Sequence, residues 1–216
     1  MNLPTDPSRF EKAIRRFDEE NSADPNGELV EGVRMPRELA HARWLSKWVL
    51  KLAPEASESL RLAARCQHIC RWRIPRADFS PDRPGYHKWR SRLKQFHAEL
   101  SENILRECGY DEETIAKVRA LNLKQNFPRD PDSQTLEDAL CLVFVEHQLA
   151  ELAARLEHQT IINALQKSWA KMSEKGRHAA LSLPLGPVEK QLLAEALKPE
   201  PQGSPASDSA DDKLTG

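Results

Sequence analysis

No apolar run in this 216-residue sequence approaches the roughly 20 residues that a membrane-spanning helix needs. The longest run is ALCLVFV, at residues 139–145. The first residues, MNLPTDPSRF, also lack the charged-then-apolar pattern of a secretory signal. We therefore expect a cytoplasmic protein with no membrane partner; its oligomeric state is left open.

The chain also lacks strand-like alternation with turn punctuation, so we expect no substantial sheet. It has only four cysteines, and only Cys66 and Cys70 have a spacing that a shared metal would need. The simpler interpretation is that all four are small buried groups in a reducing compartment. A formal net charge of −1 excludes a global field that draws the whole molecule to nucleic acid or membrane.

What the chain does have is helical periodicity, broken by proline- and glycine-rich segments. These features predict an all-α, single-domain helical bundle. We expect a main domain over residues 1–177, a peripheral helical extension over 178–198, and a disordered tail over 199–216, which has no aromatic residue. The expected helices are residues 8–20, 36–53, 55–73, 86–108, 111–124, 135–155, 157–176 and 187–197, with loops at 74–85 and 127–134.

Positive charge is concentrated in residues 61–94, which hold ten basic and two acidic residues. Most of the basic residues are arginines, the side chain that binds phosphate in a bidentate manner. Trp72 and Trp89 lie among them, where they could stack on a base. The alternative is a solvated face neutralised by acidic helices elsewhere. The candidate phosphate-binding residues are Arg65, Arg71, Arg73, Arg76, Arg83, His87 and Arg90.

Three expected helices place an imidazole or a carboxylate beside apolar positions. The three side chains are those of His41, His68 and Asp138. A buried carboxylate is costly unless it is paired or bound to metal. Because imidazole and carboxylate together suit Zn, Mn, Fe or Ni, we predict a divalent transition metal at these three residues. Glu137 and His97 are the candidate catalytic residues for proton transfer.

The same residues resemble the motif of the HD superfamily of metal-dependent phosphohydrolases. His41 is similar to its first histidine, residues 63–69 to the helix end Ala-Ala-x-x-His-Asp-Ile, and Asp138 to its distant aspartate. The resemblance implies an HD-like helical bundle and a hydrolase. This chain departs from the motif, because Gln67-His68 stands in place of His-Asp.

Longer segments resemble an uncharacterised bacterial and fungal family whose members are often labelled glutamyl-tRNA synthetase-like. The resemblance covers roughly residues 8–177. No nucleotide-binding signature of a synthetase accompanies it. The segments are ELAHARWLSKWVLKLAPEASE, LAARCQHICRWRIPR, GYHKWRSRLKQFHAE and LEDALCLVFVE.

These features lead to three hypotheses. The first is a metal-dependent phosphohydrolase that acts on a nucleotide or another phosphorylated small molecule. The second is a non-catalytic module that binds a nucleotide or an RNA end through a degenerate HD site. The third is a helical scaffold for a partner protein, since Trp and Arg are common interface anchors.

Overall fold

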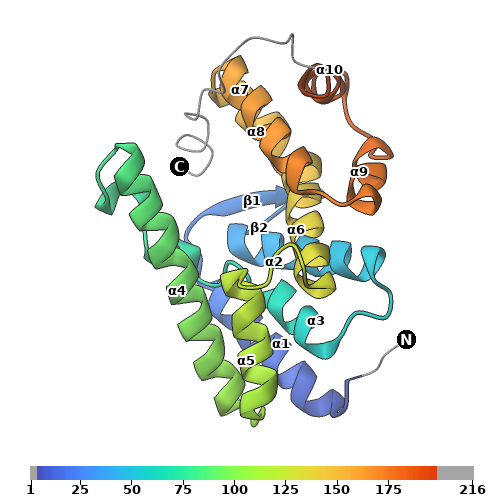
Figure 1. Ribbon diagram of the computed structural model, residues 1–216. Helices are drawn as coiled ribbons and strands as arrows, with labels where there is room; N and C mark the ends of the chain where they lie inside the picture. Colours follow the sequence, from blue (N-terminus) through green and yellow to red (C-terminus); the bar gives the residue numbers. More distant parts are fainter. Residues whose placement is uncertain (1–3, 199–216) are drawn as a thin grey trace.

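The computed structural model describes residues 4–198, and helices dominate it (Figure 1). The prediction of an all-α fold is confirmed. The α-helices are α1 (Pro7–Ser22), α2 (Arg37–Leu52), α3 (Glu58–Cys66), α4 (Arg83–Glu107), α5 (Glu112–Leu123), α6 (Pro131–Val143), α7 (Leu149–Arg155), α8 (His158–Lys171), α9 (Glu174–Leu181) and α10 (Pro187–Ala196).

Local chemistry explains where many of these helices begin. An Asp or Ser side chain at the N-cap accepts a hydrogen bond from a backbone N–H of the first turn, which would otherwise lack a partner. Proline also stands in the first turn of α1, α4, α6 and α10, where no donor is lost. The capping residues are Asp6, Ser57, Asp82, Asp111, Asp130 and Ser173.

A short hairpin precedes α2. Strand β1 (Gly27–Val30) pairs antiparallel with β2 (Val33–Pro36), and Glu31 and Gly32 form the turn with positive φ. Leu29 and Val33 are 70% and 63% exposed, so neither strand shows the half-buried alternation that identifies a strand. The expectation of no substantial sheet holds, and the hairpin is a detail that the sequence analysis did not find.

Three expected helices are interrupted, and the one expected over 157–176 divides at Met172 and Ser173 into α8 and α9. The segment 55–73 leaves the α-helix at Cys66, turns through Cys70 with a left-handed backbone (φ 52°), and makes a 3-10 turn at Arg71–Arg73. The segment 135–155 widens into a π-helical turn at Phe144–Gln148 between α6 and α7. Such π turns are uncommon and often occur near functional sites.

The main core lies where α2, α3, α5 and α6 pack together, with α4 beside α5 (Figure 1). A smaller cluster of Tyr86, Trp89 and Leu93 lies on α4 and packs against Ile74 and Phe79. The Trp89 indole donates to the Ile74 carbonyl at 2.9 Å. The proline-rich segment 74–82 is therefore an ordered layer on α4.

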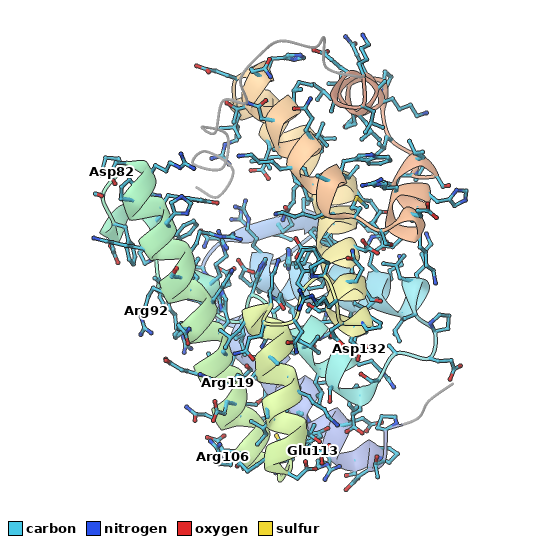
Figure 2. The ribbon with its side chains drawn as sticks, viewed as in Figure 1. Asp82, Arg92, Arg106, Glu113, Arg119 and Asp132 are labelled. Carbon is cyan, nitrogen blue, oxygen red and sulfur yellow. The ribbon has the colours of Figure 1, made fainter. Side chains whose placement is uncertain are left out.

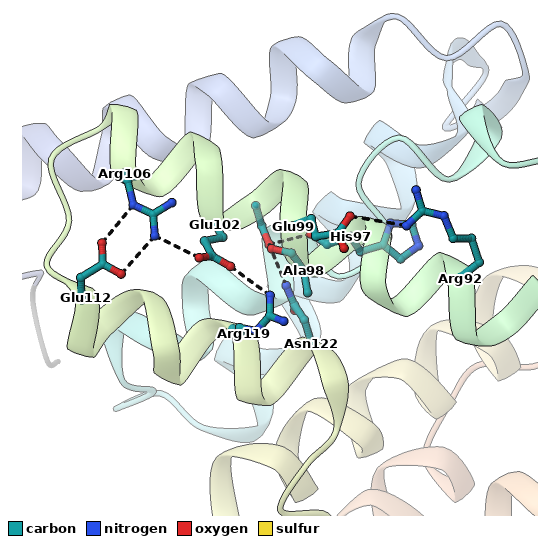
Figure 3. Close-up of polar contacts among 10 residues, drawn as sticks. Arg92, His97, Ala98, Glu99, Glu102, Arg106, Glu112, Arg119 and Asn122 are labelled. Atoms are coloured by element: carbon teal, nitrogen blue, oxygen red, sulfur yellow. Dashed lines mark hydrogen bonds and ion pairs between the residues drawn. The ribbon is translucent and has the colours of Figure 1, made fainter.

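An ion-pair network holds α4 against α5 (Figure 3). Glu102 on α4 accepts from Arg119 on α5 at 2.9 Å and from Arg106 at 3.0 Å. Inside this network, Asn122 donates to the buried Ser101 hydroxyl at 3.1 Å. Because these contacts lie one turn beyond His97, they position the middle of α4 for the site described below.

The C-terminal helices are continuous with the core. Leu192, Leu193 and Ala196 of α10 belong to the main hydrophobic cluster, and α10 packs against α8. The expected tail at 199–216 lies outside the described residues. Within residues 4–198, no helix has the length and apolar character to span a bilayer.

Candidate functional site

The N-terminal part of α2 carries two side chains that could bind a metal. Glu38 and His41 are three residues apart, so they share one face of the helix, and both are buried. The Glu38 backbone N–H donates to the Asp24 carboxylate at 3.0 Å, which anchors the beginning of α2.

His68 approaches this pair from the turn that follows α3. Its ring centroid lies 4.5 Å from that of His41, and its side chain is partly exposed. Glu38, His41 and His68 each offer one ligand atom, and these three atoms lie within 4.8 Å of one another. We call these three residues the Glu-His-His group. Because α3 ends at Cys66, the chain turns there and His68 faces α2.

His97 on α4 is the next neighbour, with its ring centroid 5.9 Å from that of His68. Its Nδ1 lies 2.8 Å from the Ile69 carbonyl oxygen. A carbonyl can only accept, so Nδ1 carries the proton and Nε2 carries the lone pair. That Nε2 is buried and has no hydrogen-bond partner within the described part of the chain.

Burial keeps these imidazoles neutral. It lowers the pKa of His41 to about 3, with help from the nearby charge of Arg71, and lowers the pKa of His97 to about 3, where the bond to Ile69 opposes it. The pKa of His68 lies well below its ordinary value for the same reasons, with His41 adding to the effect. Neutral imidazole is the form that ligates metal.

Glu38 shows the opposite shift. Burial raises its pKa to about 7, although Arg71 opposes this. No hydrogen bond or ion pair of 4 Å or less joins Glu38 to Arg71 among residues 4–198, and Glu38 Oε2 is buried without a partner. An orphaned buried carboxylate oxygen and two neutral imidazoles are a donor set that fits a divalent transition metal.

Asp138 does not join this group. Its Oδ1 accepts from the Ser173 backbone N–H at 2.8 Å and from Gln134 at 2.9 Å, and its Oδ2 accepts from the Ser173 hydroxyl. Asp138 also lies against Gly176, where an added Cβ would come within 2.7 Å of the carboxyl carbon. The predicted set of His41, His68 and Asp138 is corrected, because Asp138 fastens the beginning of α9 and Glu38 stands nearest the imidazoles.

Glu137, the candidate proton-transfer residue, is buried beside two lysines. It makes an ion pair with Lys124 and another with Lys171 at 3.7 Å. Burial raises the pKa of its carboxyl, but Lys124 and Lys171 outweigh burial and the pKa is lowered overall. Glu137 is therefore ionised and is held by lysines rather than by the imidazoles.

Two of the predicted phosphate-binding arginines lie near the Glu-His-His group. Arg71 packs over the Trp89 ring at 4.8 Å, and its charge lowers the pKa of His41 and His68. Arg90 is partly buried on α4 and affects the pKa of both His68 and His97. Both charges therefore lie close enough to the imidazoles to oppose their protonation.

Other members of the predicted set are occupied by the protein itself. Arg65 makes two bonds to Asp18, at 2.7 and 2.8 Å. Arg73 pairs with Glu20 at 2.8 Å, and Arg76 donates to backbone carbonyls of its own loop. These three arginines stabilise the fold where they stand.

The remaining members lie at the exposed beginning of α4. Arg83 and His87 are exposed there, next to the cap Asp82 that Figure 2 labels at the projecting end of the helix. Arg92 points outward from the same helix and pairs with Glu99 at 3.4 Å. The basic segment therefore divides into an outer solvated face and an inner side that faces the histidines.

Glu38 and the lysines around Glu137 were not among the predicted site residues. A signal for Glu38 was present, because Glu38-x-x-His41 has the spacing that puts two ligands on one helix face. The lysines lie at the ends of separate helices, so no local pattern links them. The four cysteines are buried and free, as expected.

Comparison with known families places the chain in one of them. A family model described as a domain of unknown function, DUF4202, matches residues 11–193. The chain belongs to this family. Neither the curated proteins nor the solved structures contain a significant match. The DUF4202 match spans α2, α3, α4 and α6, and thus contains every residue of the Glu-His-His group.

Proposed function

We propose that the protein is a metal-dependent phosphohydrolase that acts on a nucleotide or another phosphorylated small molecule. The observation that carries the proposal is the Glu-His-His group, in which Glu38 and His41 are buried and the three ligand atoms lie within 4.8 Å of one another. The choice of hydrolysis rests on the resemblance to the HD superfamily. Glu38 replaces Asp138 in the proposed ligand set.

A divalent transition metal held by Glu38, His41 and His68 would supply Lewis acidity, which allows a water molecule to lose a proton near neutral pH. His97 offers a fixed lone pair on Nε2, so it can accept a hydrogen bond from that water and orient it. Gln67 stands where the HD motif has the histidine of its His-Asp pair. It is buried, and its Oε1 has no hydrogen-bond partner among the described residues.

Arg71 and Arg90 bring positive charge to the imidazoles without an acidic partner in hydrogen-bonding contact in residues 4–198. In a partly buried site, such charges stabilise the developing negative charge of a phosphoryl group more than they would in water. Their roles are to bind and orient the substrate. Arg71 also restrains the metal affinity of the group, because it repels a cation.

Elemental analysis tests the metal centre directly. Protein purified without chelator should contain roughly stoichiometric Zn, Mn, Fe or Ni. Glu38→Gln and His41→Ala should lose it, whereas the exposed His178→Ala, a matched control on α9, should keep it. A wild-type protein that stays metal-free after incubation with each of these ions would rule the proposal out.

Phosphate release tests the reaction. A panel of nucleotides should release phosphate with the metal-loaded protein and not with the chelated protein or Glu38→Gln. Nucleotide binding that needs no metal and yields no product would instead identify a non-catalytic binding module. Absence of both metal and nucleotide binding would favour a scaffold.

A further inference from the structure

A second group of charged side chains gathers around Glu137, and the first hypotheses did not include most of it. Lys124 at the end of α5 and Lys171 at the end of α8 both make ion pairs with the Glu137 carboxylate. Arg90 and Lys94, one turn apart on α4, lie close enough to act on the same carboxylate and on these lysines. Four cations from three helices thus share one buried acid.

The charges in this group do not balance. Lys94 and Arg90 are partly buried, yet neither makes a hydrogen bond or an ion pair with any residue in 4–198. Burial lowers the pKa of Lys94. The charges of Lys124, Arg90 and Lys171 lower the pKa of Lys94 further, and only Glu137 opposes them. Holding partly buried cations close together without acidic partners of their own costs free energy, and an anion in their midst would offset that cost.

The backbone at Lys124 is a separate observation. Lys124 caps α5 in the left-handed conformation, with φ 56°, a position that glycine or asparagine usually fills. A lysine at this position carries a backbone cost of about 1 kcal/mol. The conformation directs a cationic side chain to Glu137 from the end of the helix.

We infer that Arg90, Lys94, Lys124 and Lys171 form an anion-binding site for a phosphate group of a small molecule. Arg90 belongs to both sites, since its charge also reaches Arg71, His68 and His97. One ligand with two or more linked phosphate groups would place one phosphate at the imidazoles and the next among the lysines. The substrate class is therefore a diphosphate or polyphosphate, an assignment that rests on the proposed function, whereas the anion site itself does not.

Calorimetric titration of the full-length protein with inorganic pyrophosphate, in the presence of chelator, tests the anion site without the metal. Pyrophosphate should bind more tightly than inorganic phosphate. Lys94→Met and Lys171→Met should each weaken pyrophosphate binding by about tenfold, the effect of one charge-assisted contact. Lys88→Met, an exposed change on the same helix as Lys94, should alter the affinity for pyrophosphate less than twofold. Lys94→Arg should keep most of the wild-type affinity.

The stability of Lys94→Met separates binding from a structural role. Removing one of four crowded cations should leave the thermal midpoint of the ligand-free protein unchanged or raise it. Pyrophosphate that fails to bind the wild type, or binds Lys94→Met equally well, overturns the inference. A tenfold preference for a 5′-phosphorylated RNA oligonucleotide over pyrophosphate would overturn the assignment to a small molecule. If the protein binds pyrophosphate but never takes up metal, the proposed hydrolase activity is refuted and the anion-binding site is still supported.

Discussion

Glu38→Gln offers a test in which a metal ligand and a structural carboxylate give opposite results. Burial raises the pKa of Glu38 from its ordinary 4.5 to about 7 in the folded protein. Between these two values the unfolded chain has lost the proton and the folded chain keeps it. The free energy of unfolding therefore falls as the pH rises through this window, and the loss is complete above pH 7.

The gap of roughly 2.5 pKa units corresponds to about 3 kcal/mol. In chelator at pH 8, Glu38→Gln should therefore be more stable than the wild type by about 3 kcal/mol, and at pH 5 by less than about 1 kcal/mol. Urea unfolding followed by circular dichroism measures both. The three neutral histidines have the opposite pH dependence, but they are common to both proteins and cancel in the difference.

Adding metal should reverse the order. At a thousand times its dissociation constant, a bound ion stabilises the wild type by about 4.1 kcal/mol, more than the advantage of Glu38→Gln, and should leave Glu38→Gln nearly unchanged. Glu11→Gln, an exposed change on α1, serves as the matched control and should show neither effect. If Glu38→Gln is the less stable protein at pH 8 without metal, Glu38 is a structural partner of Arg71 and the reasoning is refuted.

Three further predictions follow from the contacts described above. Asp138→Ala should lower the free energy of unfolding by about 3 kcal/mol through its lost hydrogen bonds and leave the metal content unchanged; a fall in bound metal would return Asp138 to the ligand set. Arg65→Met should cost about 1–2 kcal/mol in urea unfolding by breaking the pair with Asp18, and weaker pyrophosphate binding would show that Arg65 contacts the ligand after all. Burial raises the pKa of Cys66 to about 11 and that of Cys141 to about 12, so a thiol reagent at pH 8 should modify no cysteine of the native protein and all four after unfolding; rapid native labelling would contradict the burial.

Most of the helices could be predicted because their signals are local. Asp111 as a cap, a helix to Leu123 and the stop before the next loop all follow from residues within a few positions of one another. The interruptions were not predictable in this way. The turn after Cys66 is held in part by Asn21, whose side-chain oxygen accepts from the Cys70 backbone N–H at 3.0 Å across 49 residues of sequence.

The candidate site shows the same division. Apolar neighbours in the sequence correctly indicated that His41 and Asp138 are buried. Burial alone does not tell which partner a side chain contacts. Because α6 packs against α9, Asp138 hydrogen-bonds to Ser173. Because the chain turns after α3, His68 lies beside Glu38 and His41. The amino-acid sequence by itself determined the helical class and the caps, and it indicated the burial of His41 and Asp138, since these depend on contacts within one or two turns. Only the tertiary structure decided which carboxylate meets the imidazoles and which lysines meet Glu137, because these contacts depend on how whole helices pack.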